Sequence, residues 1–203
     1  MESSRQLAHT GRESYRQAAQ VLGRAFTDEP VSLRVYRKLS PEKRLKNLTA
    51  DFTGELAVCI RRGEPVHVCQ DGKMVASAVV YPPGTYPLGQ ADELRLLFWT
   101  IWGHSPYDLR VWMRWLEEAG KHHPQDPHYY LEYLGVEPAL QGQGLGSMLL
   151  EYLTAKADQV HVGCYLETAT RVNLPLYQRY GFRIIHETEI IGLPAWFMWR
   201  RNA

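Results

Sequence analysis

Three glycines stand at alternate positions in the stretch LQGQGLGSMLL, at Gly142, Gly144 and Gly146. A hydrophobic, strand-like run precedes them, and apolar residues with helical spacing follow. The first amides of a helix lack intrahelical partners and carry partial positive charge, and glycines let an anion approach them closely. The stretch therefore predicts a loop that binds phosphate at the start of a helix.

Two widespread kinds of phosphate loop fit this stretch less well. A Walker A loop needs a lysine and then Ser or Thr after its last glycine, whereas Gly146 is followed by Ser147 and Met148. The dinucleotide fingerprint G-x-G-x-x-G/A matches Gly142 and Gly144 but has Ser147 at its third position. A glycine-rich helix start that binds nothing stays open as a further alternative.

The spacing Q-x-x-G-x-G from Gln141 to Gly146 resembles the pyrophosphate loop of the GNAT acetyltransferase superfamily. A later stretch, LETATRVNLPLYQRYGF, is similar to that family's second signature: an acid at a strand end, an Asn, a Tyr and then Gly-Phe. The segments AFTDEP and GLPAWFMWR are similar to puromycin-type members. The likeness is strong from about residue 128 to 183 and weak across 84–120.

The resemblance implies acetyl-CoA as co-substrate, bound where two parallel strands splay apart. These strands are expected at 129–136 and 160–168. Backbone of the first strand would pair with the pantetheine arm, and amides of the glycine loop would hold the pyrophosphate. Asn173 would contact the cofactor, although an Asn before Leu-Pro is also a typical helix cap. The predicted cofactor-binding residues are Leu134, Gly135, Val136, Gln141, Gly142, Gln143, Gly144, Leu145, Gly146, Asn173 and Tyr177.

Acetyl transfer to an amine requires a base for the amine, polarisation of the thioester carbonyl and an acid for the departing thiolate. By the resemblance Tyr177 is the acid; since Leu174, Tyr177 and Tyr180 share helical spacing, a core tyrosine is the alternative. Glu132 is the predicted base, because an apolar strand would bury it and raise its pKa. Two alternatives stay open. Glu132 could instead form a salt bridge at the strand edge, or the base could act through an ordered water.

Strand alternation bears on which side chains meet the acceptor amine. It predicts one face with Tyr130, Glu132 and Leu134 and the other with Leu131, Tyr133 and Gly135. The resemblance implies that Tyr130 and Glu132 contact the acceptor, with Asp28 and Glu29 of the first interhelical turn, although turn carboxylates are usually solvated.

Two further groups of residues are expected to be structural. Glu167, at the end of the second strand, is expected to support the fold. Four tryptophans at helical spacing are expected mainly in the core, where some could line a pocket for a flat amine: Trp99, Trp102, Trp112 and Trp115.

Composition limits the class of protein. With 203 residues and 45% of them hydrophobic, the chain can form one acetyltransferase domain, 1–203, with a full core. A net charge of +1 gives no long-range attraction to nucleic acid or to an anionic membrane, and no apolar run reaches the length of a membrane span. Neither the three cysteines nor the histidines show metal-ligand spacing, so no metal is predicted; the cysteines indicate a reducing, cytoplasmic compartment.

The order of elements predicts the fold. Two helices, at 13–26 and from Ser40 to Gly63, precede a hairpin that turns at Asp71-Gly72. Two tryptophan-rich helices, a strand, the loop, a helix, a strand, a short helix and two strands follow. This order indicates an α/β (α+β type) fold: a GNAT-like mixed sheet with a V-shaped splay between two central parallel strands and helices on both faces. The last strand, AWFMWR, is expected at a sheet edge, where it could pair with a neighbour, so monomer and homodimer stay open.

The first functional interpretation is an N-acetyltransferase that moves the acetyl group of acetyl-CoA to a primary amine of a small molecule, by direct attack in a ternary complex. Acetylation of a protein lysine or N-terminus is second, and O-acetylation is third. A non-catalytic acetyl-CoA sensor is the alternative from another class. Glu132 and Tyr177 together favour the enzyme, since a sensor needs neither an acid nor a base.

Overall fold

The computed structural model describes residues 4–101 and 104–202; Trp102 and the side chain of Trp99 fall outside the described part. One mixed sheet has the strand order β1-β2-β3-β4-β5-β7-β6. Its strands are β1 (Arg5–His9), β2 (Val66–Gln70), β3 (Lys73–Tyr81), β4 (His128–Val136), β5 (Gly163–Thr168), β6 (Arg183–Ile190) and β7 (Leu193–Arg200). The helices are α1 (Tyr15–Phe26), α2 (Pro30–Val35), α3 (Pro41–Arg62), α4 (Gln90–Ile101), α5 (Pro106–Lys121), α6 (Leu145–Gln159) and α7 (Leu174–Arg179), with 3-10 turns at Pro138–Leu140 and Arg171–Asn173.

The predicted order of elements is confirmed, and local signals act as expected. The Ser40 hydroxyl accepts a hydrogen bond from the Lys43 amide at the start of α3, and Gly63 ends that helix. Asp71 and Gly72 both have positive φ, 52° and 76°, as the tight turn between β2 and β3 requires.

Two elements were not predicted. The strand β1 pairs antiparallel with β2, but its side chains are almost all exposed, so it shows no apolar alternation. The helix α2 begins directly at the DEP turn. The Glu29 carboxylate accepts hydrogen bonds from the amides of Val31 and Ser32, so the turn that ends α1 also starts a second helix.

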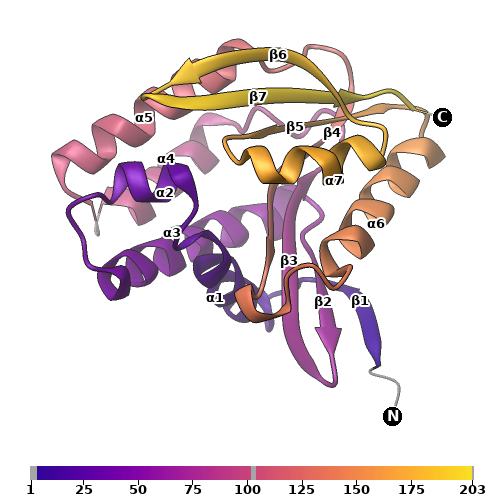
Figure 1. The fold of residues 1–203 in the computed structure, drawn as a ribbon, viewed down its shortest axis with the longest axis horizontal. Helices are drawn as coiled ribbons and strands as arrows, with labels where there is room; N and C mark the ends of the chain where they lie inside the picture. The colour runs from indigo at the N-terminus through magenta and orange to yellow at the C-terminus, as the bar shows by residue number, and fades with distance from the viewer. Residues whose placement is uncertain (1–3, 102–103, 203) are drawn as a thin grey trace.

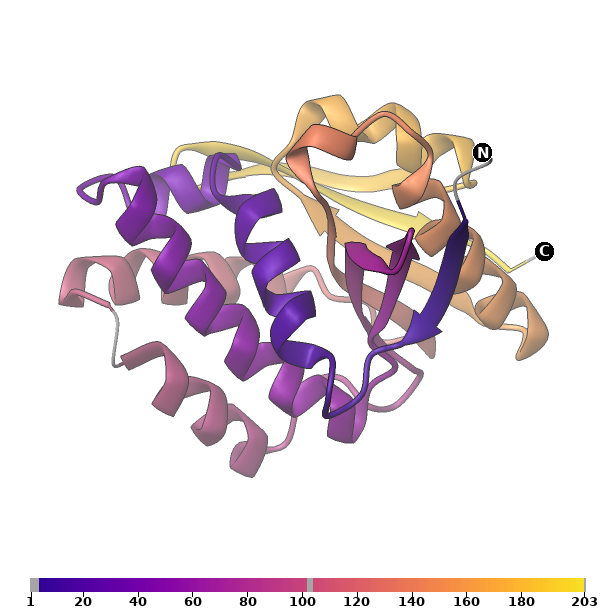
Figure 2. The same ribbon diagram turned by 90° about the horizontal axis from the view of Figure 1, so that it is seen from below.

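Helices cover both faces of the sheet, as predicted (Figures 1 and 2). On one face α1, α2, α3 and α5 pack in a cluster with Tyr81, Tyr130 and Tyr165 of the strands. This is the α3 face. On the other, the α6 face, α6 and α7 pack against Tyr129, Leu131 and Cys164. Trp115 is buried in the α3-face cluster and Trp112 packs against it, as expected for core tryptophans.

The prediction that AWFMWR is an edge strand is wrong. These residues belong to β7, which lies between β5 and β6, while β1 and β6 form the edges of the sheet. The chain turns at Ile191 and Gly192, which have φ of 52° and 80°, and β7 returns between its neighbours. Side chains 195–198 are consequently buried.

A β-bulge at Glu132 interrupts β4. Val80 pairs with Leu131 and Val79 with Tyr133, so Glu132 has no partner on β3. Parallel pairing with β5 extends only to Tyr130. Beyond this point β4 continues beside β3 and β5 continues beside β7. The two central strands therefore diverge, which confirms the predicted V-shaped splay; a bulge bends a strand and increases its twist.

Gly135 lets α1 lie close to the splayed end of β4. An added Cβ at Gly135 would be 2.8 Å from the Ala25 Cβ and 2.9 Å from a Leu22 methyl.

We expect Gly135→Ala to lower the free energy of unfolding by about 1–3 kcal/mol, because the Ala25 Cβ cannot rotate away. Gly120→Ala is the control: nothing lies within 4 Å of its added Cβ inside α5, so a gain of about 0.5–1 kcal/mol is expected. Urea unfolding measures both, and an unchanged Gly135→Ala protein would contradict this close packing.

Candidate active site

The glycine loop has the backbone of an anion site. Gly142 and Gly144 have φ of 75° and 84°, which glycine adopts at little cost. Gly144 is the N-cap of α6 and no side chain caps this helix, so its first amides stay available to an external acceptor. Residues 141–144 are exposed. These features fit a pyrophosphate, as predicted for 141–146.

Two side chains hold the loop in place. The Gln141 side-chain amide donates to the Val136 carbonyl at the end of β4, at 3.3 Å. Arg5 of β1 donates from Nη1 to the Gln143 carbonyl at 2.8 Å, which places a positive charge beside the loop. The sequence analysis missed Arg5 because it did not predict β1.

The start of α6 lies against both β4 and α7. A Cβ at Gly146 would be 3.5 Å from Leu134, 3.7 Å from Val136 and 3.8 Å from Leu176. Asn173 directly precedes α7 and makes no side-chain capping bond, so the helix-cap alternative for this residue is not supported. The structure thus brings the predicted loop, the end of β4 and the start of α7 together.

The predicted alternation along β4 is wrong from the bulge onward. Tyr130 and Tyr133 both belong to the α3-face cluster, whereas Leu131 and Leu134 belong to the α6-face cluster. The extra residue at Glu132 reverses the phase of the side chains that follow it. As a result Leu134 lies on the side of the glycine loop.

The Glu132 carboxyl meets Glu55 of α3, a residue that the sequence analysis missed. The two carboxyl groups interact directly, and each shifts the pKa of the other. Two carboxyl groups in such proximity share one proton, because two adjacent negative charges repel. Tyr81 donates its hydroxyl to Glu55 Oε1 at 3.0 Å. Burial, and then the Glu55 charge, raise the pKa of Glu132 well above its ordinary value. Burial raises the pKa of Glu55 as well, but the hydrogen bond from Tyr81 favours its charged form. We therefore assign the shared proton to Glu132 and the charge to Glu55. No ion pair joins Glu132 to another described residue, which leaves its salt-bridge alternative without support.

Glu167 lies on the same face, across the splay. Its Oε1 accepts a hydrogen bond from the Tyr130 hydroxyl at 2.5 Å. Burial raises the pKa of Glu167 to about 7, and its charge contributes to the raised pKa of Glu132. Glu167 thus supports Tyr130, as a structural residue would, but it also adds negative potential beside the predicted base.

Tyr177 lies on the opposite side of the sheet. It is buried in the α6-face cluster, with its ring centroid 6.2 Å from that of Phe182. Burial, and then the Glu29 charge, raise its phenol pKa to about 12, so the hydroxyl is a proton donor at neutral pH. The predicted acid and the predicted base therefore lie on opposite faces of the sheet.

The two carboxylates of the first interhelical turn differ. Glu29 is largely buried, caps α2 and accepts a hydrogen bond from the Thr170 hydroxyl at 3.3 Å; its charge reaches Tyr177. Asp28 is 84% exposed and pairs with Arg44 at 3.1 Å. Glu29 thus lies near the predicted site, whereas Asp28 is directed to Arg44 and solvent.

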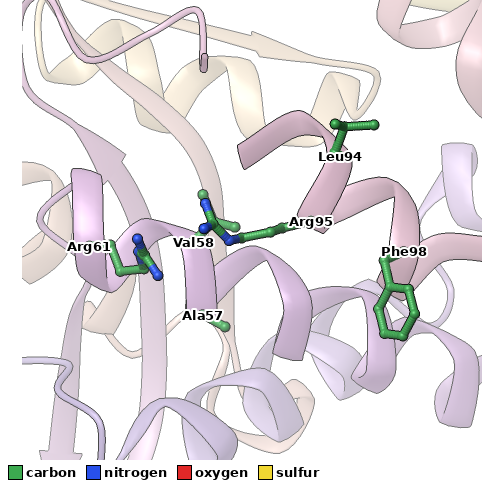
Figure 3. A pocket seen from close by; sticks show the side chains of 6 residues that line it. All are labelled: Ala57, Val58, Arg61, Leu94, Arg95 and Phe98. Carbon is green, nitrogen blue, oxygen red and sulfur yellow. The ribbon is translucent and has the colours of Figure 1, made fainter. Parts of the chain in front are cut away.

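A separate pocket lies between α3 and α4 (Figure 3). It has a volume of about 350 Å³ and contains none of the predicted site residues. Its lining consists of Ala57, Val58, Arg61, Leu94, Arg95 and Phe98. Because it lacks a carboxylate, a phenol or a glycine loop, it offers neither acid nor base for acetyl transfer.

The described residues give little support to other functional classes. They contain no group of three or more His, Cys, Asp or Glu side chains able to hold a metal ion, and Cys59, Cys69 and Cys164 are free thiols. None of the helices in this part of the chain is long and apolar enough to cross a membrane.

Comparison with known proteins decides the family. Residues 32–182 match the model of the Acetyltransferase (GNAT) family. The chain belongs to the GNAT acetyltransferase family. It is 27% identical over 180 residues to an uncharacterized N-acetyltransferase, C550.08, of Schizosaccharomyces pombe (strain 972 / ATCC 24843), covering 84% of this chain and 71% of that relative. This GNAT chain is therefore an acyltransferase.

Solved structures agree in fold. A structure described as histone acetyltransferase HPA2 and related acetyltransferase, from Corynebacterium glutamicum ATCC 13032, has a TM-score of 0.70 and 21% identity over 98% of this chain and 97% of that chain. Arylalkylamine N-acetyltransferase 2 from Aedes aegypti has a TM-score of 0.64 and 14% identity over 98% of this chain and 100% of that chain. At such identities the likeness shows the mixed α/β fold of the GNAT family.

The raised pKa of Glu132 predicts how stability depends on pH. A carboxyl group whose pKa is higher in the folded state stabilises the fold below its unfolded pKa of about 4.5, and this contribution is lost as pH rises through the folded value. A glutamine side chain at this position keeps a hydrogen-bond donor and never ionises. We expect Glu132→Gln to raise the melting temperature relative to wild type at pH 8 more than at pH 5. Glu42→Gln, an exposed change on α3, is the control. If the difference in melting temperature between Glu132→Gln and wild type does not vary with pH, the pKa of Glu132 is not raised in the folded protein.

Proposed function

We propose that this GNAT enzyme transfers the acetyl group of acetyl-CoA to a primary amine of a small molecule, by direct attack in a ternary complex, within one domain spanning 1–203. One observation carries the proposal. Glu132 lies at the bulge where β4 leaves β5 and interacts with Glu55 of α3, Tyr177 is buried in the α6-face cluster, and the uncapped start of α6 carries the glycine loop.

The co-substrate would lie between the diverging strands. The amides at 142–146 and the positive Arg5 would hold the pyrophosphate, and the β4 backbone at 134–136, which has no β5 partner, would pair with the pantetheine amides. Bound there, acetyl-CoA supplies an activated thioester. Asn173, near the start of α7, would contact the same arm.

The two proton transfers of the reaction are made by residues on different faces of the sheet. On the α3 face the carboxyl pair takes a proton from the amine, so that its lone pair can attack the thioester carbon. On the α6 face the C–S bond breaks, and the Tyr177 hydroxyl donates a proton to the sulfur. Tyr130 lies near the acceptor, with its hydroxyl fixed on Glu167. A direct attack of this kind needs no covalent acyl-enzyme.

Two observations bear on the acceptor. The aromatic rings and carboxyl groups around Glu132 suit a compact cationic amine, and the Aedes aegypti neighbour is named for arylalkylamines. The Corynebacterium glutamicum neighbour is named for a histone acetyltransferase, so a protein lysine is the second candidate acceptor. The likeness to puromycin-type members and a cytoplasmic location stay predictions.

Thiol release from acetyl-CoA tests the transferase directly. The purified protein is screened with arylalkylamines, polyamines, aminonucleosides, amino acids and short peptides, with calorimetry on acetyl-CoA alone in parallel. We expect acetyl-CoA to bind and one class of small amine to release thiol. Release with peptides alone would favour the protein acceptor, and binding without release would favour the sensor. No binding would remove the phosphate role of the glycine loop.

Replacement of Tyr177 by Phe tests the acid. The variant keeps the buried ring but cannot protonate the thiolate, so kcat should fall at least roughly ten-fold with little change in the acetyl-CoA dissociation constant. Tyr180→Phe is a matched control, because the Tyr180 hydroxyl instead donates to Glu151 in an exposed hydrogen bond. If Tyr177→Phe turns over like wild type, Tyr177 is not the acid.

A further inference from the structure

Glu55 occupies an unusual position in α3. The apolar face of this helix includes Phe52, Leu56 and Cys59, all buried, and Glu55 falls within the same stripe at helical spacing. A carboxylate at such a position is costly unless it has partners. Its partners are the Tyr81 hydroxyl and the protonated Glu132. The pair thus holds one proton and one negative charge.

Within the described part of the chain, no cation compensates this charge. No Lys, Arg or His there forms an ion pair with Glu55, Glu132 or Glu167. Glu132 Oε2 is fully buried and accepts no hydrogen bond from an N–H or O–H of the described residues. The neighbouring charge on α3, Asp51, is also negative and acts on Glu55. A partly buried anion without a counterion suits a ligand that brings positive charge.

Two groups of aromatic rings each contain a tyrosine whose pKa both carboxyl groups raise, Tyr133 in one and Tyr81 in the other. Phe26, Phe52 and Tyr133 form one group, with ring centroids 5.0–5.8 Å apart. Tyr81, Tyr86 and Tyr130 form the other, with centroids 4.7–6.4 Å apart. Ring faces attract cations, and ammonium ligands are commonly bound among aromatic side chains.

A cavity lies beside the second aromatic group. Tyr86 and Tyr130 line a cavity of about 180 Å³ together with His123 and His128. Burial lowers the pKa of His123 to about 4 and lowers the pKa of His128 as well. Both imidazoles are therefore neutral at pH 7 and would not repel an approaching cation.

We propose that Glu55, together with Glu132, forms the site that binds the acceptor as an ammonium ion, and that Glu55 selects cationic primary amines over neutral nucleophiles. This inference rests on the proposed function and names its substrate class. The carboxylate of Glu55 supplies the attraction, and the two aromatic groups enclose the cation.

The protonation state of the Glu55–Glu132 pair determines where the protons of the acceptor go. The bound acceptor is R–NH₃⁺, and the Glu55 carboxylate removes one proton, which leaves a neutral amine beside two protonated carboxyl groups. The nitrogen lone pair then forms the C–N bond as the C–S bond breaks. The pair passes the first proton to solvent, so the Glu55 carboxylate can accept the second proton that nitrogen loses and release it in turn. Tyr177 gives its hydroxyl proton to the sulfur and regains one proton from solvent. The products are an amide, free thiol and one proton.

Three probes with one carbon skeleton test the charge requirement: 2-phenylethylamine, its N,N,N-trimethyl cation and 2-phenylethanol. Calorimetry on the CoA-saturated protein measures their binding without turnover. We expect wild type to bind both cations and to bind the alcohol at least roughly ten-fold more weakly. Equal affinity for the alcohol, or no binding of either cation, would overturn the proposal.

Variants separate the two carboxyl groups. Glu55→Gln should weaken binding of both cations at least roughly ten-fold, and Glu55→Asp, which keeps the charge, should recover most of it. Glu132→Gln should keep cation binding within about three-fold but lower kcat, because it keeps the charge on Glu55 and removes the carboxyl group that shares a proton with it. Glu42→Gln on the same helix is the control, and acetyl-CoA affinity should be equal in all four. Cation binding by Glu55→Gln at wild-type strength would overturn the proposal.

The outcome is independent of the transferase assay. If cations bind as expected but no amine releases thiol, the ammonium site stands and the proposed acetyl transfer fails. If amines are acetylated while Glu55→Gln matches wild type in cation affinity and KM, the transferase stands and the role of Glu55 fails.

Discussion

One extra residue in β4 determines the geometry of the site. Without the bulge at Glu132, β4 and β5 could continue their parallel pairing and close the space between them. The bulge comes two residues after Tyr130, the last residue of β4 that pairs with β5, and bends the strand away. Burial changes at the same place: residues 128–131 are buried, whereas 132–134 are partly exposed. The strands diverge where a substrate needs room.

The divergence gives the site two chemically different sides. The α3 face carries carboxyl groups and tyrosines, and the α6 face carries the glycine loop and Tyr177. A thioester between the strands would be open to attack from the first side and to protonation of its leaving group from the second. The partly buried carboxyl pair and the phenol thus need not compete for the same space, and each keeps a pKa set by its own surroundings.

Much of this arrangement could be predicted from the sequence, and particular residues show why the rest could not. The loop from Gln141 to Gly146 and the stretch around Tyr177 are local patterns with a local cause, so their elements were predicted correctly. The bulge leaves no such pattern, so strict alternation assigned Leu134 to the wrong face. Glu55 had a signal, a carboxylate within an apolar helical stripe, but its partner is 77 residues away in sequence. Arg5 was missed because its exposed strand shows no apolar period.

Amide hydrogen exchange along β4 and α6, with and without acetyl-CoA, tests most directly whether the splay is the cofactor site. In the free protein, amides at 128–130 should exchange slowly because they lie in the paired part of the sheet, and those at 134–136 and 142–146 should exchange faster. Acetyl-CoA should slow exchange at both of the latter segments. Unchanged exchange at 134–136 on binding, or protection confined to α3 and α4 around the separate pocket, would contradict the account.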